Sequence, residues 1–336
     1  PARIAGMHHG GSPDPEQLRF CKPESVYFGG AGWTQARHQL MERFSESLGG
    51  TWEIALERDF ERVVAGLTTV SDWLGSAEPC DRREIRGLEE AREIVRNAGL
   101  IAPEMDESLD FEALFGFSPN TTQAALSQFS EPGLYILEDQ TGGGKTEAAL
   151  GLAFELMKNG VNRGIYFGLP TQLTSNQMCL RMEEFLDAAV RNRHETAAML
   201  LHAKAKYMER NPYGEDAAPG GSWFDPAKRG ILAPFTTGTV DQALLSQINV
   251  PHNFVRSFGL FGKVVILDEV HSFDEYTGYL IESLVRFLKN AGATIIVLSA
   301  TLDRGMRERL LDGPSVPSNH YPLITAQPHN HPETPQ

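Results

Sequence analysis

The stretch Leu-Tyr-Ile-Leu-Glu-Asp-Gln-Thr-Gly-Gly-Gly-Lys-Thr, residues 134–146, decides the fold. Its apolar start predicts a buried strand, and residues 147–159 predict a helix that ends before Gly160. Glycines let backbone N–H groups approach a polyphosphate closely, and a helix N-terminus favours negative charge. The stretch therefore predicts a phosphate-binding loop between a strand and a helix.

The polar residues of this loop have predicted roles. Lys145 would reach the β- and γ-phosphates of ATP, and Thr146 would bind Mg²⁺. The residues that would hold the triphosphate are Thr141, Gly142, Gly143, Gly144, Lys145 and Thr146. Asp139 stands where the pattern G-x-x-x-x-G-K-T has its first glycine, and an acid near phosphates is unfavourable unless it points away. A glycine-rich turn with an incidental lysine is the alternative interpretation.

The stretch Lys-Val-Val-Ile-Leu-Asp-Glu-Val-His, residues 263–271, predicts a second buried strand that ends in two acids and a histidine. Asp268 stands where phosphate-loop enzymes place a Mg²⁺-binding acid, and Glu269 could orient the attacking water. Lys145, Asp268 and Glu269 are thus the predicted catalytic residues. His271 could couple the nucleotide to neighbouring elements. Taken alone, this pattern also fits an ordinary solvated strand end.

Short apolar runs alternate with helical segments from about residue 117 onwards. The runs are 134–137, 164–169, 231–235, 264–267 and 294–298. This alternation predicts an α/β domain with a mostly parallel sheet, whereas residues 36–115 show helical periodicity at 37–48, 54–67 and 86–97. We therefore predict three parts: a helical part over 1–115, an α/β domain over 116–312 and a proline-rich linker over 313–336.

The composition excludes several classes of protein. With 336 residues, 41% hydrophobic and 22% charged, the chain is too long for one small module and too apolar for intrinsic disorder. Cys21, Cys80 and Cys179 form no CxxC pair, which argues against structural zinc and favours a reducing cytoplasm. No apolar run is long enough for a membrane span, and no signal peptide is visible. The net charge of −14 argues against non-specific nucleic-acid binding but allows a local basic channel.

The glycine-rich loop, Asp-Glu-x-His and Ser299-Ala-Thr301, in this order, resemble the first RecA-like domain of superfamily 2 helicases. Longer matches narrow the resemblance to the CRISPR-associated helicase-nucleases of type I systems. They are G-G-G-K-T-E-A-A-L (142–150), L-P-T-Q-L-T-S-N (169–176), G-T-V-D-Q-A-L-L (238–245), D-E-V-H-S-F-D (268–274) and L-S-A-T-L (298–302). His252 and Arg256, ahead of the acidic strand, also match this family.

The resemblance implies an ATP-dependent, single-stranded DNA translocase that a crRNA-guided, Cascade-type surveillance complex recruits. Gln123 would read the adenine of ATP. The residues implied in DNA contact or coupling are Pro170, Thr171, Thr239, Asp241, Gln242, His271, Ser299 and Thr301. For Gln123 and Thr171, a helix-surface amide and a helix N-cap are equally good interpretations.

Residues 8–10 (His-His-Gly) and 63–76 resemble the last metal-binding motifs of an HD-type nuclease domain. By this resemblance His8, His9 and Asp72 would ligate a divalent transition metal, Fe²⁺, Mn²⁺, Co²⁺ or Ni²⁺, of a DNA-cleaving site. A surface histidine pair and an aspartate paired with a neighbouring base are the alternatives.

The family has further parts that the resemblance places outside these residues. The earlier metal ligands would precede Pro1, and a second RecA-like domain with an arginine finger would follow Thr325. Because an arginine finger is worth about 10³–10⁵ in rate, this chain alone is expected to hydrolyse ATP weakly. Two other functions stay open: an RNA-directed superfamily 2 helicase, and a fragment that binds DNA or a partner without catalysis.

Overall fold

A seven-stranded sheet forms the centre of the molecule. The structure, a computed structural model, describes residues 58–76, 87–196, 198–201, 229–315 and 321–329, with short pieces between 35 and 43. The strands are β1 (Gly133–Glu138), β2 (Ile165–Leu169), β3 (Ala198–Leu201), β4 (Phe235–Thr239), β5 (Val264–Leu267), β6 (Thr294–Ser299) and β7 (Leu323–Pro328). Their order is β3-β4-β2-β5-β6-β1-β7, and all neighbours are parallel except β7, which runs antiparallel to β1.

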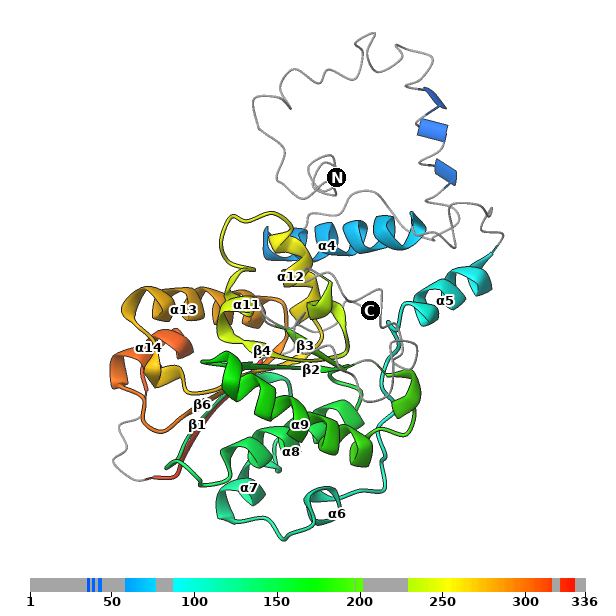
Figure 1. Cartoon of the computed structure of the whole chain (residues 1–336). Helices are drawn as coiled ribbons and strands as arrows, with labels where there is room; N and C mark the ends of the chain where they lie inside the picture. Colours follow the sequence, from blue (N-terminus) through cyan, green and yellow to red (C-terminus); the bar gives the residue numbers. More distant parts are fainter. Residues whose placement is uncertain are drawn as a thin grey trace.

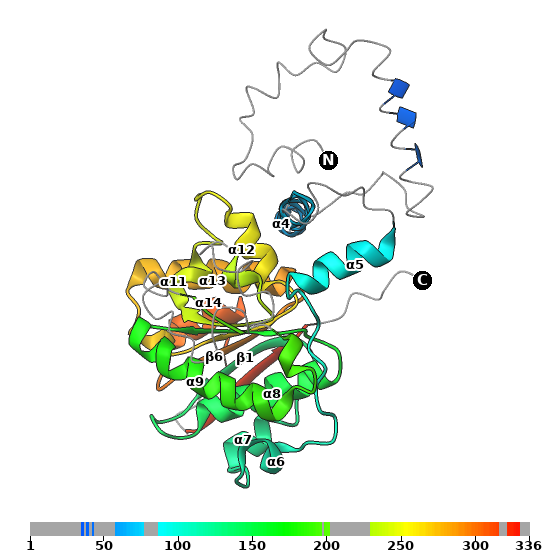
Figure 2. The same ribbon diagram turned by 45° about the vertical axis from the view of Figure 1, so that its right-hand side comes forward.

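Helices cover both faces of the sheet (Figures 1 and 2). One face carries α7 (Thr121–Leu126), α8 (Lys145–Lys158) and α9 (Gln172–Ala189). The other carries α11 (Val240–Leu244), α12 (Asn253–Leu260), α13 (Glu275–Asn290) and α14 (Arg304–Leu311). The described helices ahead of these are α4 (Arg58–Gly75), α5 (Leu88–Asn97) and α6 (Phe111–Phe115). None of the helices in the described ranges is long and apolar enough to cross a membrane.

The two helical layers make two apolar cores. In β1, Leu134 and Ile136 belong to the core under α11–α14, while Tyr135 and Leu137 belong to the core under α8 and α9. Successive side chains of a strand point to opposite faces, so a strand covered on both faces has to be apolar throughout. This explains why β1 and its parallel neighbour β6 read as apolar runs in the sequence.

Helix α4 packs closely against α12 at a glycine. A Cβ on Gly66 would lie 2.4 Å from Cβ of Phe258 and 2.5 Å from the backbone oxygen of Phe254. A glycine at this position therefore lets the two helix backbones approach each other more closely than any other residue would. Since α4 also contributes Val63 and Val70 to the core under α12, it is joined to the α/β domain by buried apolar side chains.

The predicted fold class is confirmed: helices precede a RecA-like domain with a mostly parallel sheet. Three strands differ from the prediction. The predicted strand at 231–235 begins only at Phe235, because Gly230–Leu232 forms a buried 3₁₀ turn. Strand β3 was not predicted, and β7 lies inside the stretch predicted as a linker, where Leu323–Pro328 pairs with β1. Most of the helix predicted at 37–48 lies outside the described residues.

Candidate nucleotide-binding site

The carboxyl ends of β1, β5 and β6 bring the phosphate loop and the two other predicted nucleotide motifs to one edge of the sheet. In the pairing of β1 with β6, Glu138 lies opposite Ser299. Strand β6 also pairs with β5, whose last residue Leu267 precedes Asp268. Ligands of open parallel sheets bind outside the carboxyl ends of the strands, so this edge is the expected nucleotide site.

The phosphate loop has the backbone of a polyphosphate cradle. Gly142 and Gly144 have positive φ angles of 83° and 81°, which favour glycine, and Gly144 directly precedes α8. Gly143 has no positive φ, but a Cβ there would lie 2.5 Å from Oδ2 of Asp139 and the carboxylate would have to shift. The Asp139 carboxylate thus lies against the Gly143 backbone, where Oδ1 also accepts the N–H of Gln140 at 2.8 Å.

Lys145 is the buried first residue of α8. Its Nζ donates to the backbone oxygens of Asp139 at 2.6 Å and Gln140 at 2.9 Å. The ammonium therefore lies within the loop itself, at the helix end that favours anions.

Helix α7 holds the phosphate loop from outside. Asn120 and Gln123 form a capping box at the start of α7, in which each side chain accepts the other residue's backbone N–H. Their amide nitrogens reach the loop, since Asn120 Nδ2 donates to the oxygen of Gly143 at 3.1 Å and Gln123 Nε2 to that of Gly144 at 3.2 Å. Gln123 therefore lies beside the loop, and its role toward adenine stays a prediction.

The acidic motif follows β5 with a special backbone conformation. Glu269 has a φ of 56°, an uncommon angle for a residue other than glycine. Burial, together with the smaller influence of the neighbouring Glu269 charge, raises the pKa of the Asp268 carboxyl to about 6. The smaller influence of Lys145, which lowers this pKa, indicates that the predicted Mg²⁺ ligand and the phosphate-loop lysine share one site.

A chain of polar contacts joins the acidic motif to the Ser-Ala-Thr segment. Oε2 of Glu269 lies 3.1 Å from Nε2 of His271, and Nδ1 of the same imidazole lies 3.0 Å from Oγ of Ser299. Ser299 Oγ in turn donates to the backbone oxygen of Thr301 at 2.8 Å. His271 therefore bridges the residue predicted to orient water and the segment predicted to link the nucleotide to the DNA groove.

These donors fit a nucleoside triphosphate with Mg²⁺. The loop offers backbone N–H groups, an ammonium and a helix N-terminus to phosphates. Oxygen ligands suit Mg²⁺, and the Thr146 hydroxyl and the Asp268 carboxylate are of that kind.

The residues predicted to contact DNA lie at the same edge of the sheet. Leu169 ends β2 opposite Thr239, which ends β4, so Pro170 and Asp241 follow neighbouring strands. Thr171 is exposed, and its hydroxyl caps α9 by accepting the N–H of Thr174 at 3.2 Å. The side chain of Thr239 is buried, whereas those of Pro170, Asp241 and Gln242 are exposed or half-buried.

Of the three residues predicted to bind the nuclease metal, the structure describes only Asp72. His8 and His9 lie outside the described residues. Asp72 is exposed near the C-terminal end of α4. In the ranges that the structure covers, no three His, Cys, Asp or Glu side chains come together as a metal site. His252 lies near α4 instead of the nucleotide edge, with its ring centroid 5.4 Å from that of Trp73.

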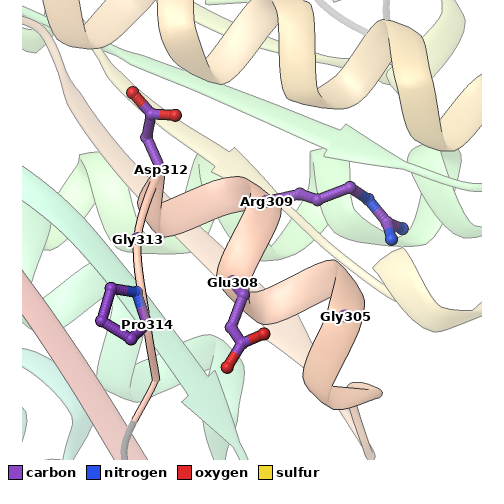
Figure 3. A pocket seen from close by; sticks show the side chains of 6 residues that line it. All are labelled: Gly305, Glu308, Arg309, Asp312, Gly313 and Pro314. Atoms are coloured by element: carbon purple, nitrogen blue, oxygen red, sulfur yellow. The ribbon is translucent and has the colours of Figure 1, made fainter.

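An open hollow of about 580 Å³ lies over the end of α14 (Figure 3). Glu308 and Arg309 contribute its charged lining, together with Asp312. Glu308 already pairs with Arg304 at 2.8 Å, and Arg309 pairs with Glu282 at 2.5 Å. Since Glu308 and Arg309 are paired within the protein, and no predicted motif lines the hollow, we do not assign the nucleotide to it.

Comparison with known families matches both parts of the chain. The family described as DEAD/DEAH box helicase matches residues 120–309. The chain belongs to this helicase family. The HD domain of Cas3 matches residues 1–80. The resemblance to the CRISPR-associated helicase-nucleases is therefore confirmed for the helical part as well as for the helicase domain.

Individual relatives cover nearly the whole chain. The CRISPR-associated endonuclease/helicase Cas3 of Thermus thermophilus is 34% identical over 93% of this chain and 37% of its own length. The corresponding Escherichia coli protein is 28% identical over 94% of this chain and 40% of its own length. The crystal structure of T. fusca Cas3 superposes with a TM-score of 0.82 at 28% identity, over 98% of this helicase chain and 41% of that one. The chain thus spans about two fifths of the length of these relatives.

The sequence patterns did not reveal the role of Asn120 at the phosphate loop, nor a buried ion pair of Glu138 with Arg307 that lies outside the nucleotide site. Asn120 carried a local signal, because the pattern Asn-x-x-Gln that ends in Gln123 is that of a capping box. Glu138 and Arg307 carried none, since their ion pair joins residues that lie 169 positions apart.

Proposed function

We propose that this chain is the ATP-binding part of an ATP-dependent, single-stranded DNA translocase and helicase, joined to part of a metal-dependent DNA nuclease. It would act in type I CRISPR defence in the cytoplasm, where a crRNA-guided surveillance complex would recruit it to target DNA. The HD-type portion would span residues 1–115, the first RecA-like domain 116–312, and the connection to a second one 313–336. Support for the partner comes from a chain in a structure of a CRISPR RNA-guided surveillance complex, which superposes with a TM-score of 0.62 at 26% identity.

The observation that carries this proposal is the meeting of three motifs at one edge of the sheet. The backbone of Gly142 and Gly144 would hold the phosphates, and Lys145 would neutralise the β- and γ-phosphates. Asp268 and Thr146 would together bind Mg²⁺. When bound, this ion would stabilise the charge on the transferred phosphoryl group. A structure of T. fusca Cas3 described as its ATP form superposes on this chain with a TM-score of 0.80 at 29% identity.

Glu269 would act on the attacking water. Its carboxylate is half-buried, and His271 fixes it from one side at 3.1 Å. A carboxylate held in this way orients water and accepts its proton. Since His271 also contacts Ser299, the same imidazole would report the state of the nucleotide to the Ser299–Thr301 segment and so to the DNA groove.

Nucleotide binding with matched lysine variants tests the proposal. Lys145 and Lys158 are the first and last residues of α8, so both substitutions fall on the same helix. We expect Lys145→Ala to abolish binding of a fluorescent ATP analogue in Mg²⁺, and Lys158→Ala to leave it unchanged. Equal affinity in wild type and Lys145→Ala would overturn the nucleotide site. Stimulation of ATP hydrolysis by single-stranded DNA, and not by RNA of the same sequence, tests the nature of the polymer.

A further inference from the structure

The last residue of β1 forms a buried ion pair with the helix that follows the Ser-Ala-Thr segment. Arg307 Nε donates to Oε2 of Glu138 at 2.9 Å, and its Nη2 donates to Oε1 at 2.9 Å. The Glu138 side chain is fully buried and that of Arg307 is 6% exposed. Such a bidentate pair fixes both the distance and the orientation of the two elements.

The same pair holds the backbone of Leu302, the residue after Thr301. Oε1 of Glu138 accepts the N–H of Leu302 at 2.9 Å, while Nη2 of Arg307 donates to its oxygen at 3.2 Å. Both backbone groups of Leu302 are therefore bonded to the ion pair. Two apolar side chains in the same space could not hold a peptide unit in this way.

Glu138 also directly precedes the phosphate loop. The backbone oxygen of the next residue, Asp139, accepts Nζ of Lys145 at 2.6 Å, and the Asp139 N–H donates to the oxygen of Ser299 at 3.2 Å. A displacement of Asp139 would therefore move Glu138, and through it Leu302. The ion pair thus forms a second route between the phosphate loop and the Ser-Ala-Thr segment, separate from the one through His271.

Stability alone does not explain this pair. Burying two charges costs solvation free energy, and replacing a buried ion pair by apolar side chains of similar volume is often neutral or stabilising. Removing only one partner is strongly destabilising, because it leaves an uncompensated charge. A double apolar replacement therefore distinguishes two roles of the pair. If the pair only stabilises the fold, the replacement should leave function intact; if the pair fixes the geometry, the replacement should impair function.

We propose that Glu138 and Arg307 are positioning residues that couple the nucleotide site to the DNA-facing Ser299–Thr301 segment. This inference rests on the proposed ATP-dependent DNA translocase. Neither residue needs to touch ATP, so their substitution should leave nucleotide binding intact and remove the mutual influence of nucleotide and DNA.

The test uses the native polypeptide that contains these residues, with Glu138→Gln, Arg307→Met and the double variant Glu138→Met/Arg307→Met. Glu282→Gln is the matched control, because it removes the partner of Arg309 on the exposed side of α14. Urea unfolding reports stability. The affinity for a non-hydrolysable ATP analogue, measured with and without single-stranded DNA, reports coupling, and kcat and KM for ATP complete the set.

We expect the single variants to unfold at lower urea concentration. The double variant should recover only part of the loss, because it leaves no uncompensated charge but leaves the N–H and oxygen of Leu302 without these partners. The double variant and Glu138→Gln should bind the analogue as wild type does without DNA, but DNA should no longer raise that affinity. In wild type we expect DNA to raise the affinity for the analogue about 5- to 150-fold, the usual range for two coupled sites, and this factor should be lost in the variants. With DNA present, kcat should fall and KM for ATP should rise to its value without DNA, and Glu282→Gln should behave as wild type.

Wild-type coupling in the double variant would overturn this inference and leave the pair with a structural role only. Should the double variant not fold, wild-type coupling in Glu138→Gln has the same meaning, because glutamine keeps the shape and an oxygen for the Leu302 N–H. Failure of the proposed function is a different result: wild type and Lys145→Ala would then bind ATP equally, whatever the ion-pair variants do.

Discussion

At the scale of single residues, Gly143 has no positive φ angle, and the neighbour that limits its side chain is the Asp139 carboxylate. A Cβ on Gly143 would meet Asp139 Oδ2 at 2.5 Å and its Cγ at 2.7 Å. Overpacking of this kind costs about 1–3 kcal/mol. We expect Gly143→Ala to weaken nucleotide binding by about 5- to 150-fold, since about 1.4 kcal/mol is tenfold in affinity. Titration with a fluorescent ATP analogue measures this loss.

The double variant Asp139→Ala/Gly143→Ala provides the control for this prediction. Removing the carboxylate opens the space that the new methyl group needs, so binding should recover toward that of Asp139→Ala alone. Two losses that simply add would show that the residues do not interact, because additivity is the behaviour of independent sites. That outcome would contradict the steric explanation of the Asp139–Gly143 pair.

Lys263 makes stability depend on pH. Burial lowers the pKa of its ammonium to about 7, below the value of about 10.4 in an unfolded chain. Between these values the unfolded state binds more protons, so the free energy of unfolding should rise with pH by up to about 1.4 kcal/mol per pH unit. We expect the difference in urea unfolding free energy between wild type and Lys263→Met to grow in favour of wild type between about pH 7 and pH 9.

A difference that stays flat with pH would contradict this prediction. Lys263 Nζ lies near three oxygens, those of Ile231 at 2.7 Å, Ala233 at 2.5 Å and the Thr236 hydroxyl at 3.3 Å. Three acceptors match the three N–H groups of an ammonium. A flat difference would thus mean that these bonds keep the amine charged throughout.

At the scale of elements, the contact of α4 with α12 depends on Gly66. Alanine in place of glycine normally stabilises a helix interior by about 0.5–1 kcal/mol. Here the added Cβ would lie 2.5 Å from the backbone oxygen of Phe254, and overpacking costs about 1–3 kcal/mol, so the cost outweighs the gain. We expect Gly66→Ala to lower the free energy of unfolding and to speed amide hydrogen exchange in α4.

Gly75, the last residue of the same helix, is the control for this contact. A Cβ there meets nothing within 4 Å, so Gly75→Ala should leave both stability and exchange in α4 close to wild type. Equal exchange in the two variants would mean that the close approach at Gly66 does not hold α4 on the α/β domain.

Which elements the sequence could predict follows from their surroundings. Strands β1, β5 and β6 are buried on both faces and so appear as apolar runs. Strand β7 is a half-exposed edge strand that follows Pro322 and ends at Pro328, and its turn-rich flanks indicated a linker. It becomes a strand because it pairs with β1, a long-range contact that no local pattern contains.

The same distinction applies within the candidate site. The phosphate loop and the acidic motif are local patterns whose chemistry is readable from residue types alone. How His271 joins Glu269 to Ser299, and how Glu138 meets Arg307, depends on the order β5-β6-β1 in the sheet. A sequence predicts which strands exist more readily than which strands are neighbours, so these contacts required the structure.

At the scale of the whole molecule, the predicted nuclease and ATPase chemistries lie on different structural parts. Asp72 lies on α4, within the residues that match an HD domain, whereas the nucleotide motifs lie at the carboxyl edge of the sheet. Groups that share no contacts usually have independent effects on free energy. The two activities should therefore be separable by single substitutions, although both reside on one chain with a net charge of −14.

We predict that Asp72→Ala in the native polypeptide abolishes metal-dependent cleavage of single-stranded DNA and spares ATP hydrolysis, because a lost carboxylate ligand affects only the metal site. Ser71→Ala, at the adjacent exposed position of α4, should leave both activities unchanged. Nuclease assays with Mn²⁺ or Ni²⁺ and a phosphate-release assay on the same preparations measure the two outcomes. Equal loss of both activities in Asp72→Ala would instead indicate that the end of α4 supports the ATPase domain, and that Asp72 is no metal ligand.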